Sequence, residues 1–238
     1  MKINIKRFTK DLILRLVFNK IMALLFLRLL LRVHSLAYNF SGRYAGILNS
    51  GVHPKHGIMR YKEWFESNIK DDWVILDIGS NTGMMPNHMS QKAKYVYGIE
   101  IEPKLVNLAI KNNSKDNIKY ICADVVNFDF STLDSIDCIT MSNVLEHIED
   151  RKFFLKTLLN NVSWKNKKFF LIRVPMINRD WISVYKKEIG MEYRLDHTHF
   201  IEYTFSGFEK ELNDVGINID SYEIKFGEIY AVCSNKSI

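Results

Sequence analysis

Seven short apolar segments, most of them separated by helix-like segments, constrain the fold of this chain more than any other feature. Helical patterns fall between them at residues 84–93, 149–162 and 204–216, and Pro103 begins another. Buried strands that alternate with helices are typical of a mostly parallel sheet covered by helices on both faces. We therefore predict an α/β domain of three layers over residues 61–238. The expected strands span residues 73–79, 95–101, 118–124, 135–143, 167–175, 217–226 and 228–234.

Acidic residues close the first three predicted strands at nearly equal spacing. Asp77, Glu100 and Asp124 are 23 and 24 residues apart. Ligands of open α/β sheets bind at the carboxyl ends of the strands, so we expect these acids to face one ligand. Asp77 opens the segment DIGSNTG, in which Gly79 and Gly83 allow a tight turn and a close approach of a ligand to the backbone. The G-x-x-x-G spacing of these glycines fits neither the G-x-G-x-x-G fingerprint of dinucleotide-binding proteins nor the P-loop.

The segment DIGSNTG, with Glu100 and Asp124 ending the next two strands, resembles the motifs of class I S-adenosylmethionine-dependent methyltransferases. The first motif of that family is often D-x-G-x-G-x-G, and Asn81 replaces its middle glycine here. The resemblance covers roughly residues 60–234. It implies a Rossmann-like, seven-stranded domain that uses S-adenosyl-L-methionine as its cofactor. By the resemblance, Asp77 and the backbone of Gly79, Asn81 and Gly83 hold the methionine part.

The same resemblance implies roles for residues farther along this edge. Glu100 would accept hydrogen bonds from both ribose hydroxyls, and Ile101 would pack on the adenine. Asp124, with the backbone of Val125, would read the adenine amino group. Asn143, which follows the fourth strand, would begin the wall beside the transferred methyl group. These motifs do not identify the acceptor.

Three histidines are candidates for the base that an alcohol acceptor needs. His147 follows the fourth strand, and His197 and His199 lie in DHTHF, inside an insertion at residues 176–204. With Asp196, these two histidines could form a base with an orienting acid, or a metal pair. Without a catalytic role, His197 and His199 could form local hydrogen bonds in a polar loop, and His147 could pack at the start of a helix. Some quinone-type relatives bind a metal with E-x-x-E-H at this place. Because Asn143 replaces the first acid, Glu146 and His147 lack a third ligand and we expect no metal.

Other side chains in or beside the insertion fit two interpretations each. Arginine can bind a phosphate or carboxylate of an acceptor, or it can pair with an acidic neighbour. The aromatic side chains could stack on a ring of the acceptor or fill a small core. The residues concerned are Arg173, Arg179, Arg194, Trp181, Tyr185, Tyr193 and Phe200.

The first sixty residues form a separate, basic region, which we predict to be a helical extension and a linker. Residues 1–62 hold twelve Lys and Arg and one acid, Asp11, a balance of +11, so the remainder sums to 6 − 11 = −5. The predicted helix is apolar almost all round, and glycines at 35–62 suggest a linker. The longest uncharged run, Ile21–Leu27, is shorter than the ~20 residues of a membrane span, and no secretory signal is expected.

Two interpretations of this helix remain open. Residues 1–34 could lie in an anionic membrane surface, with basic groups on the phosphates. Alternatively the helix packs on the domain, as part of a homodimer. The three cysteines, Cys122, Cys138 and Cys233, show no disulfide or zinc spacing and are expected to be buried free thiols in a reducing cytoplasm.

We therefore expect a cytoplasmic enzyme, peripheral to the inner face of the membrane, that methylates an oxygen of a small-molecule or glycan acceptor. The segments RVP and HTHF, together with the N-terminal segment, resemble those of methyltransferases of surface-polysaccharide synthesis. This resemblance favours a lipid-linked sugar as the acceptor. A quinone-type acceptor is the alternative. RNA methylation is disfavoured because the basic residues are interleaved with Leu and Phe and no Asn-Pro-Pro-Tyr-type tetrad follows the fourth strand. A non-catalytic binding protein is the third possibility, against which the intact acids argue.

Overall fold

The computed structural model describes residues 19–235, which divide into two compact units. The first contains the described residues up to Ile58 together with Glu188–Met191. The second contains Met59–Lys187 and the described residues from Glu192 onward. Each unit is considered by itself below.

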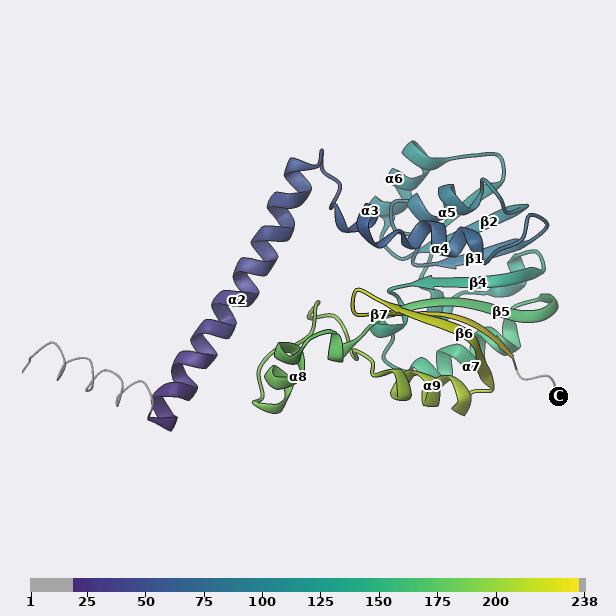
Figure 1. Cartoon of the computed structure of the whole chain (residues 1–238). Helices are drawn as coiled ribbons and strands as arrows, with labels where there is room; N and C mark the ends of the chain where they lie inside the picture. The colour runs from purple at the N-terminus through teal and green to yellow at the C-terminus, as the bar shows by residue number, and fades with distance from the viewer. Residues whose placement is uncertain (1–18, 236–238) are drawn as a thin grey trace, which may run out of the picture. The chain divides into compact units, whose positions relative to one another are not determined.

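A seven-stranded sheet forms the centre of the second unit (Figure 1). The strand order is β3-β2-β1-β4-β5-β7-β6; β7 runs antiparallel to β5 and β6, and the other neighbours are parallel. The predicted α/β fold with a mostly parallel seven-stranded sheet is thus confirmed. The strands are β1 (Val74–Ile78), β2 (Tyr95–Glu100), β3 (Ile118–Cys122), β4 (Ile136–Ser142), β5 (Trp164–Pro175), β6 (Ile217–Lys225) and β7 (Glu228–Asn235).

Helices cover both faces of this sheet. Alternate residues of a strand point to opposite faces, so each face buries its own apolar side chains under helices. Ile75 of β1 packs in a cluster with Trp64 and Met89, whereas Leu76 packs in another with Leu155 and Phe208. The first cluster lies under α4 and α5, and the second lies under α7 and α9. The helices of this unit are α4 (Tyr61–Ser67), α5 (Met84–Met89), α6 (Pro103–Asn113), α7 (Arg151–Asn161), α8 (Trp181–Glu188) and α9 (Phe205–Asp214); α3 spans Lys55–Met59.

The insertion after β5 is closed at its base by backbone hydrogen bonds. The N–H of Ile177 donates to the carbonyl of Tyr203, and the N–H of Tyr203 donates to the carbonyl of Pro175, each at 2.9 Å. Met176 and Tyr203 form an isolated bridge there. The chain therefore leaves the sheet and returns to it at nearly the same point.

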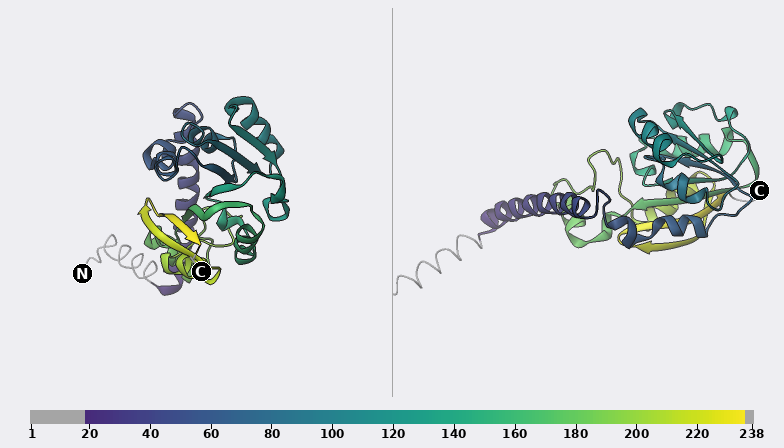
Figure 2. Two further views of the ribbon diagram at one scale, coloured as in Figure 1. Left: turned by 90° about the vertical axis from the view of Figure 1, so that its right-hand side faces the viewer. Right: turned by 90° about the horizontal axis from the view of Figure 1, so that it is seen from above.

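A single long helix, α2 (Lys20–Leu48), dominates the first unit and corrects the predicted linker (Figures 1 and 2). Residues 35–48, which we predicted to be irregular, continue the helix through Gly42 and Gly46. A glycine costs a helix only about 1 kcal/mol relative to alanine, and good helix formers surround both. The helix ends at the Asn49 cap, shortly before Gly51 adopts φ +86°.

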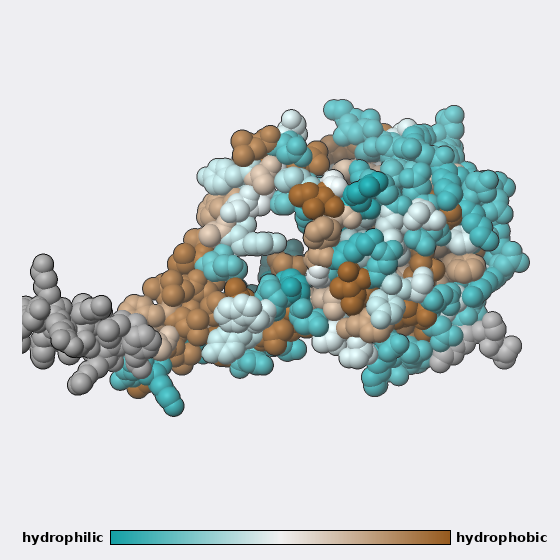
Figure 3. Space-filling view, viewed as in Figure 1, coloured by the Kyte–Doolittle hydropathy of each residue, from teal (hydrophilic) through white to brown (hydrophobic). Residues whose placement is uncertain are grey.

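Apolar side chains are exposed along much of α2 (Figure 3). Its 29 residues would extend ~43 Å, more than the ~30 Å of a bilayer core. By length and composition, it is the one helix in the described part of the chain that could cross a membrane. The expectation that this region is too short to span rested on the longest uncharged run, Ile21–Leu27; the continuous helix is longer than that run, so its length alone does not exclude a span. Exposed residues include Ile21, Leu25, Leu29, Leu30, Val33, Leu36 and Ile47.

The helix α9 is capped by Thr204, whose Oγ1 accepts from the N–H of Gly207 at 3.1 Å. The prediction of three buried thiols is wrong for one of them: Cys138 and Cys233 are buried, but Cys122, the last residue of the edge strand β3, is exposed. Gly216 follows α9 with φ +84°, as expected for a residue that ends a helix.

Candidate functional site

The turn after β1 needs its two glycines for steric reasons. Gly79 has φ +72° and Gly83 has φ +81°, a region that suits residues without a Cβ. A Cβ on Gly79 would lie 2.5 Å from Cγ2 of Val144, and one on Gly83 would lie 2.5 Å from the hydroxyl of Tyr120. The turn is therefore packed tightly against β3 and against the segment that follows β4.

The backbone N–H groups of this turn are engaged within the protein. The resemblance implied that the backbone of residues 79–83 holds the ligand. All five N–H groups here have acceptors, so the turn supplies space for close approach rather than unpaired donors. The N–H groups of Gly79 and Ser80 donate to Ile99 O, that of Asn81 to Glu100 Oε2, that of Thr82 to Asn81 Oδ1, and that of Gly83 to Ser80 O.

Glu100, at the end of β2, has both carboxylate oxygens fixed by the backbone. Oε2 accepts from the N–H of Asn81 at 2.9 Å, and Oε1 accepts from the N–H of Glu102 at 3.0 Å. Each oxygen of an ionised carboxylate can accept a further hydrogen bond, so this group can receive two adjacent hydroxyls. Ile101, the next residue, is 60% exposed and offers an apolar surface beside it.

Asp77, at the end of the neighbouring strand β1, is almost entirely buried. Its Oδ1 accepts from the hydroxyl of Thr140 on β4 at 2.6 Å. Burial raises the pKa of the Asp77 carboxyl to about 7, and the hydrogen bond from Thr140 offsets only part of that rise. A cationic ligand group would favour the ionised form. Thr140 was not among the predicted site residues, although a hydroxyl in an otherwise apolar, buried strand could have indicated it.

Asp124 and Asn143 complete the predicted edge. Asp124 is exposed, and its oxygens accept from the N–H of Val126 at 3.0 Å and from Nδ2 of Asn127 at 2.7 Å, which begins a short 3₁₀ turn at Val125–Asn127. Asn143 has φ +56°, and its Nδ2 donates to Glu228 at 3.3 Å. Since β3, β2, β1 and β4 are adjacent, the fold brings the carboxyl ends that carry these residues to one edge.

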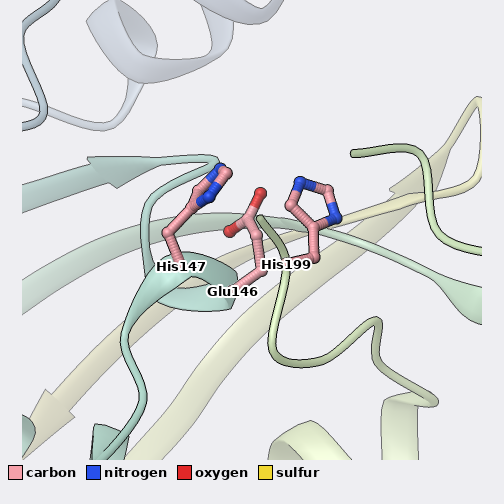
Figure 4. Close-up of side chains that lie close together, drawn as sticks. All are labelled: Glu146, His147 and His199. Carbon is pink, nitrogen blue, oxygen red and sulfur yellow. The ribbon is translucent and has the colours of Figure 1, made fainter. Parts of the chain in front are cut away.

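A cluster of Glu146, His147 and His199 lies past the end of β4 (Figure 4). One carboxylate oxygen and one nitrogen from each ring all lie within 4.8 Å of one another. The carboxylate of Glu146 lies beside the two imidazoles, whose centroids are 4.6 Å apart. Glu146 and His147 belong to a 3₁₀ turn at Leu145–His147, and the carbonyl of Glu146 accepts from the N–H of Phe200, which holds the insertion against this turn.

The three side chains of this cluster differ in exposure. Glu146 is fully buried, and neither carboxylate oxygen has a hydrogen-bond partner among the described residues. Burial raises the pKa of Glu146 to about 8. His199 is buried, whereas the ring of His147 is accessible. Burial, followed by the proximity of His199, lowers the pKa of His147, so this imidazole is neutral at neutral pH.

His197, the remaining candidate base, does not join this cluster. Its side chain is 89% exposed, and its Nδ1 lies 3.4 Å from Asp196. The prediction that no metal binds used the lack of a third ligand beside Glu146 and His147. That reason no longer holds, because the insertion supplies His199.

The arginines of this region pair with acids or backbone carbonyls. Arg173 is buried and binds Glu228 with two nitrogens. Arg179 binds Glu202, and Arg194 donates to the carbonyl of His199 at 2.8 Å. These contacts match the pairing interpretation rather than acceptor binding. Trp181 and Phe200, at 68% and 55% exposed, do not fill a core.

Comparison with known proteins identifies the fold. Residues 76–162 match the family model described as methyltransferase domain. The crystal structure of magnesium protoporphyrin IX methyltransferase from Synechocystis PCC 6803, with bound SAH, is similar, with a TM-score of 0.56 and 16% identity. The match covers 76% of this chain and 83% of that protein.

Curated relatives match over shorter lengths. Ribosomal RNA small subunit methyltransferase A of Syntrophus aciditrophicus is 37% identical over 68 residues, 28% of this chain and 24% of that protein. Carboxy-S-adenosyl-L-methionine synthase of Staphylococcus epidermidis is 28% identical over 135 residues, 54% of this chain and 57% of that protein. The chain therefore spans less than two thirds of the length of either relative.

Proposed function

Since the chain has a domain of the class I, S-adenosylmethionine-dependent methyltransferase family, we propose that it methylates an oxygen of a small-molecule or glycan acceptor at the cytoplasmic face of a membrane. The methyl group of the cofactor's sulfonium is already activated, so the protein mainly has to position two reactants. The observation that carries this proposal is the arrangement of Asp77 and Glu100 on neighbouring parallel strands, at the edge where such sheets bind ligands.

The described residues fit the cofactor in three places. Glu100, fixed by two backbone N–H groups, would accept from the ribose hydroxyls, and exposed Ile101 would cover the adenine. The buried carboxyl of Asp77 would attract the cofactor's ammonium group. Asp124, beside the buried Val125, would accept from the adenine amino group.

The acceptor would meet the cofactor near the Glu146–His147–His199 cluster. This cluster follows β4, which is adjacent to β1, and the insertion that supplies His199 is the segment most suited to shape an acceptor site. An acceptor hydroxyl must lose its proton during transfer. His147 is the exposed member of the cluster, so an acceptor can reach it. Its lowered pKa favours the neutral imidazole, which is the form that can take up a proton.

Association with a membrane is supported by α2. The helix exposes leucine, isoleucine and valine side chains along its length, and residues 20–48 contain four Lys or Arg and no acid. An apolar helix with basic side chains favours a surface of anionic lipid. A lipid-linked sugar is the acceptor that best suits an enzyme held at such a surface.

One experiment tests the acceptor class. The full-length protein is incubated with a cell extract and cofactor carrying a labelled methyl group, and the extract is separated into lipid, water-soluble and RNA fractions. We expect label in the lipid fraction that mild acid converts to a water-soluble form, as a lipid-linked glycan requires. Acid-stable lipid label would instead indicate a quinone-type acceptor, and label confined to RNA would contradict the proposal. Glu100→Ala should abolish incorporation, while Glu102→Ala, at the exposed neighbour, should retain it.

A second experiment tests the membrane. Liposomes with anionic phospholipid should carry the full-length protein upward in a density gradient, and Leu25→Glu with Leu29→Glu should prevent this. Leu108→Glu, at an exposed leucine of α6, is the matched control. Release of the bound protein by alkaline carbonate would indicate a helix lying on the surface. Release only by detergent would indicate a helix that crosses it.

A further inference from the structure

The side chains around His147 and His199 determine which ring nitrogen donates a hydrogen bond within the protein. The hydroxyl of Thr198 lies 2.9 Å from Nδ1 of His147 and donates its one hydrogen to Asp196 at 2.8 Å. It can therefore only accept from Nδ1–H. Nδ1 of His199 lies 3.3 Å from a carboxylate oxygen of Glu202, which likewise accepts.

In its neutral form each imidazole therefore has its hydrogen on Nδ1 and a lone pair on Nε2. Histidines that bind metals show this arrangement, in which one nitrogen donates to a carboxylate, carbonyl or hydroxyl and the other faces the ion. The partner of His199 is itself held in place, because Glu202 also binds Arg179 and the N–H of Leu195. The rings are thus oriented before any ligand arrives.

Glu146 supplies the third donor. Its carboxylate lies completely buried beside the two rings (Figure 4), and within the described residues neither oxygen has a hydrogen-bond partner. A buried carboxylate without a partner is unfavourable. A cation bound between the rings would remove this penalty.

We propose that Glu146, His147 and His199 bind one divalent transition-metal ion of the zinc class. Two imidazoles and one carboxylate favour zinc, iron, cobalt or manganese over magnesium and calcium, which prefer oxygen ligands. Ligand atoms around a tetrahedral zinc lie ~3.4 Å apart for bonds of ~2.1 Å. The three donors, within 4.8 Å of one another, reach this spacing through small side-chain rotations.

Three protein ligands leave a coordination position open. A hydroxyl bound there would release its proton to solvent water more readily, because a metal ion acts as a Lewis acid. In this arrangement the ion, rather than a free imidazole, prepares the acceptor oxygen. This role depends on the proposed methyl transfer, whereas binding of the ion does not.

The test is a titration of the untagged full-length protein, without cofactor or acceptor. Co²⁺ is followed by its visible absorption and Zn²⁺ by calorimetry. We expect one ion per chain at this site, with binding at least tenfold weaker in Glu146→Gln, His147→Ala and His199→Ala. His197→Ala, two residues from a ligand, should bind as the wild type does. His53→Ala serves to subtract binding at the separate His53–His56 pair, whose rings are 6.4 Å apart.

The outcomes separate the two proposals. Wild-type protein that binds no ion, or Glu146→Gln and His147→Ala variants that bind as tightly as the wild type, would overturn the metal site. If the buried His199→Ala variant unfolds, the other two variants decide, because His147 is exposed and glutamine keeps the volume of Glu146. Ion binding without methyl transfer would count against the proposed function alone. If methyl transfer persists after complete removal of the ion, the ion does not deprotonate the acceptor, and only that role would be refuted.

Discussion

Replacing Asp77 by Asn should stabilise the cofactor-free protein at pH 8 relative to the wild type, and much less at pH 5. Burial raises the pKa of the Asp77 carboxyl from 3.8 to about 7. Between these values the unfolded chain releases the proton while the folded protein keeps it. The carboxyl therefore contributes stability that is fully present below pH 4 and is lost as the pH rises through about 7. Asparagine has no proton to lose.

The magnitude follows from the shift in pKa. Each pH unit between 5 and 7 removes about 1.4 kcal/mol from the free energy of unfolding of the wild type, or about 2.7 kcal/mol over the interval. The advantage of Asp77→Asn should therefore grow by about 2.7 kcal/mol between pH 5 and pH 8.

Urea unfolding followed by tryptophan fluorescence at the two pH values measures this difference. Asp71→Asn, at an exposed aspartate just before β1, is the matched control. If both variants show the same dependence on pH, the buried carboxyl does not titrate as its surroundings require. The reasoning about Asp77 would then be wrong.

Three further substitutions test other parts of the site. Glu100→Ala should weaken cofactor binding by about 2 kcal/mol, or about thirty-fold in Kd by calorimetry, because charge-assisted hydrogen bonds are lost; an unchanged Kd would remove Glu100 from the site. Gly79→Ala should lower the free energy of unfolding by about 2 kcal/mol, since its Cβ would lie 2.5 Å from Val144; an unchanged thermal midpoint would show that the turn relaxes. Arg173→Leu should cost about 3–5 kcal/mol in urea unfolding because Glu228 stays buried without its partner, and adding Glu228→Gln should recover part of that loss; no recovery would refute this explanation.

Much of the domain could be predicted because its local signals and its packing agree. Strands such as Val74–Ile78 and Ile136–Ser142 are short apolar runs that are buried on both faces, and each lies within the predicted range. Asp77 and Glu100 lie near the carboxyl ends of the parallel neighbours β1 and β2. The alternation of strands and helices was therefore enough to predict that both acids lie at one edge of the sheet. Roles for Asp77 and Glu100 in cofactor binding stay predictions.

Features that depend on tertiary contacts could not be predicted. Gly42 and Gly46 suggested a linker, but glycine only weakens a helix and nothing in the sequence ends α2 before Asn49. The meeting of Glu146 with His199 is set by how the insertion folds back, for which the sequence carries no periodic signal. The pairing of Arg173 with Glu228 likewise depends on the antiparallel register of β5 and β7.

The backbone hydrogen bonds that tie Tyr203 to Pro175 and Ile177 make the insertion a module. Substitutions between these anchor points can leave the pairing of the sheet unchanged while they alter the acceptor site that we propose the insertion to form. Evolution could therefore diversify the acceptors of such a protein while its cofactor-facing edge stays constant. The same property makes residues 178–202 the natural segment to transplant when engineering a new specificity.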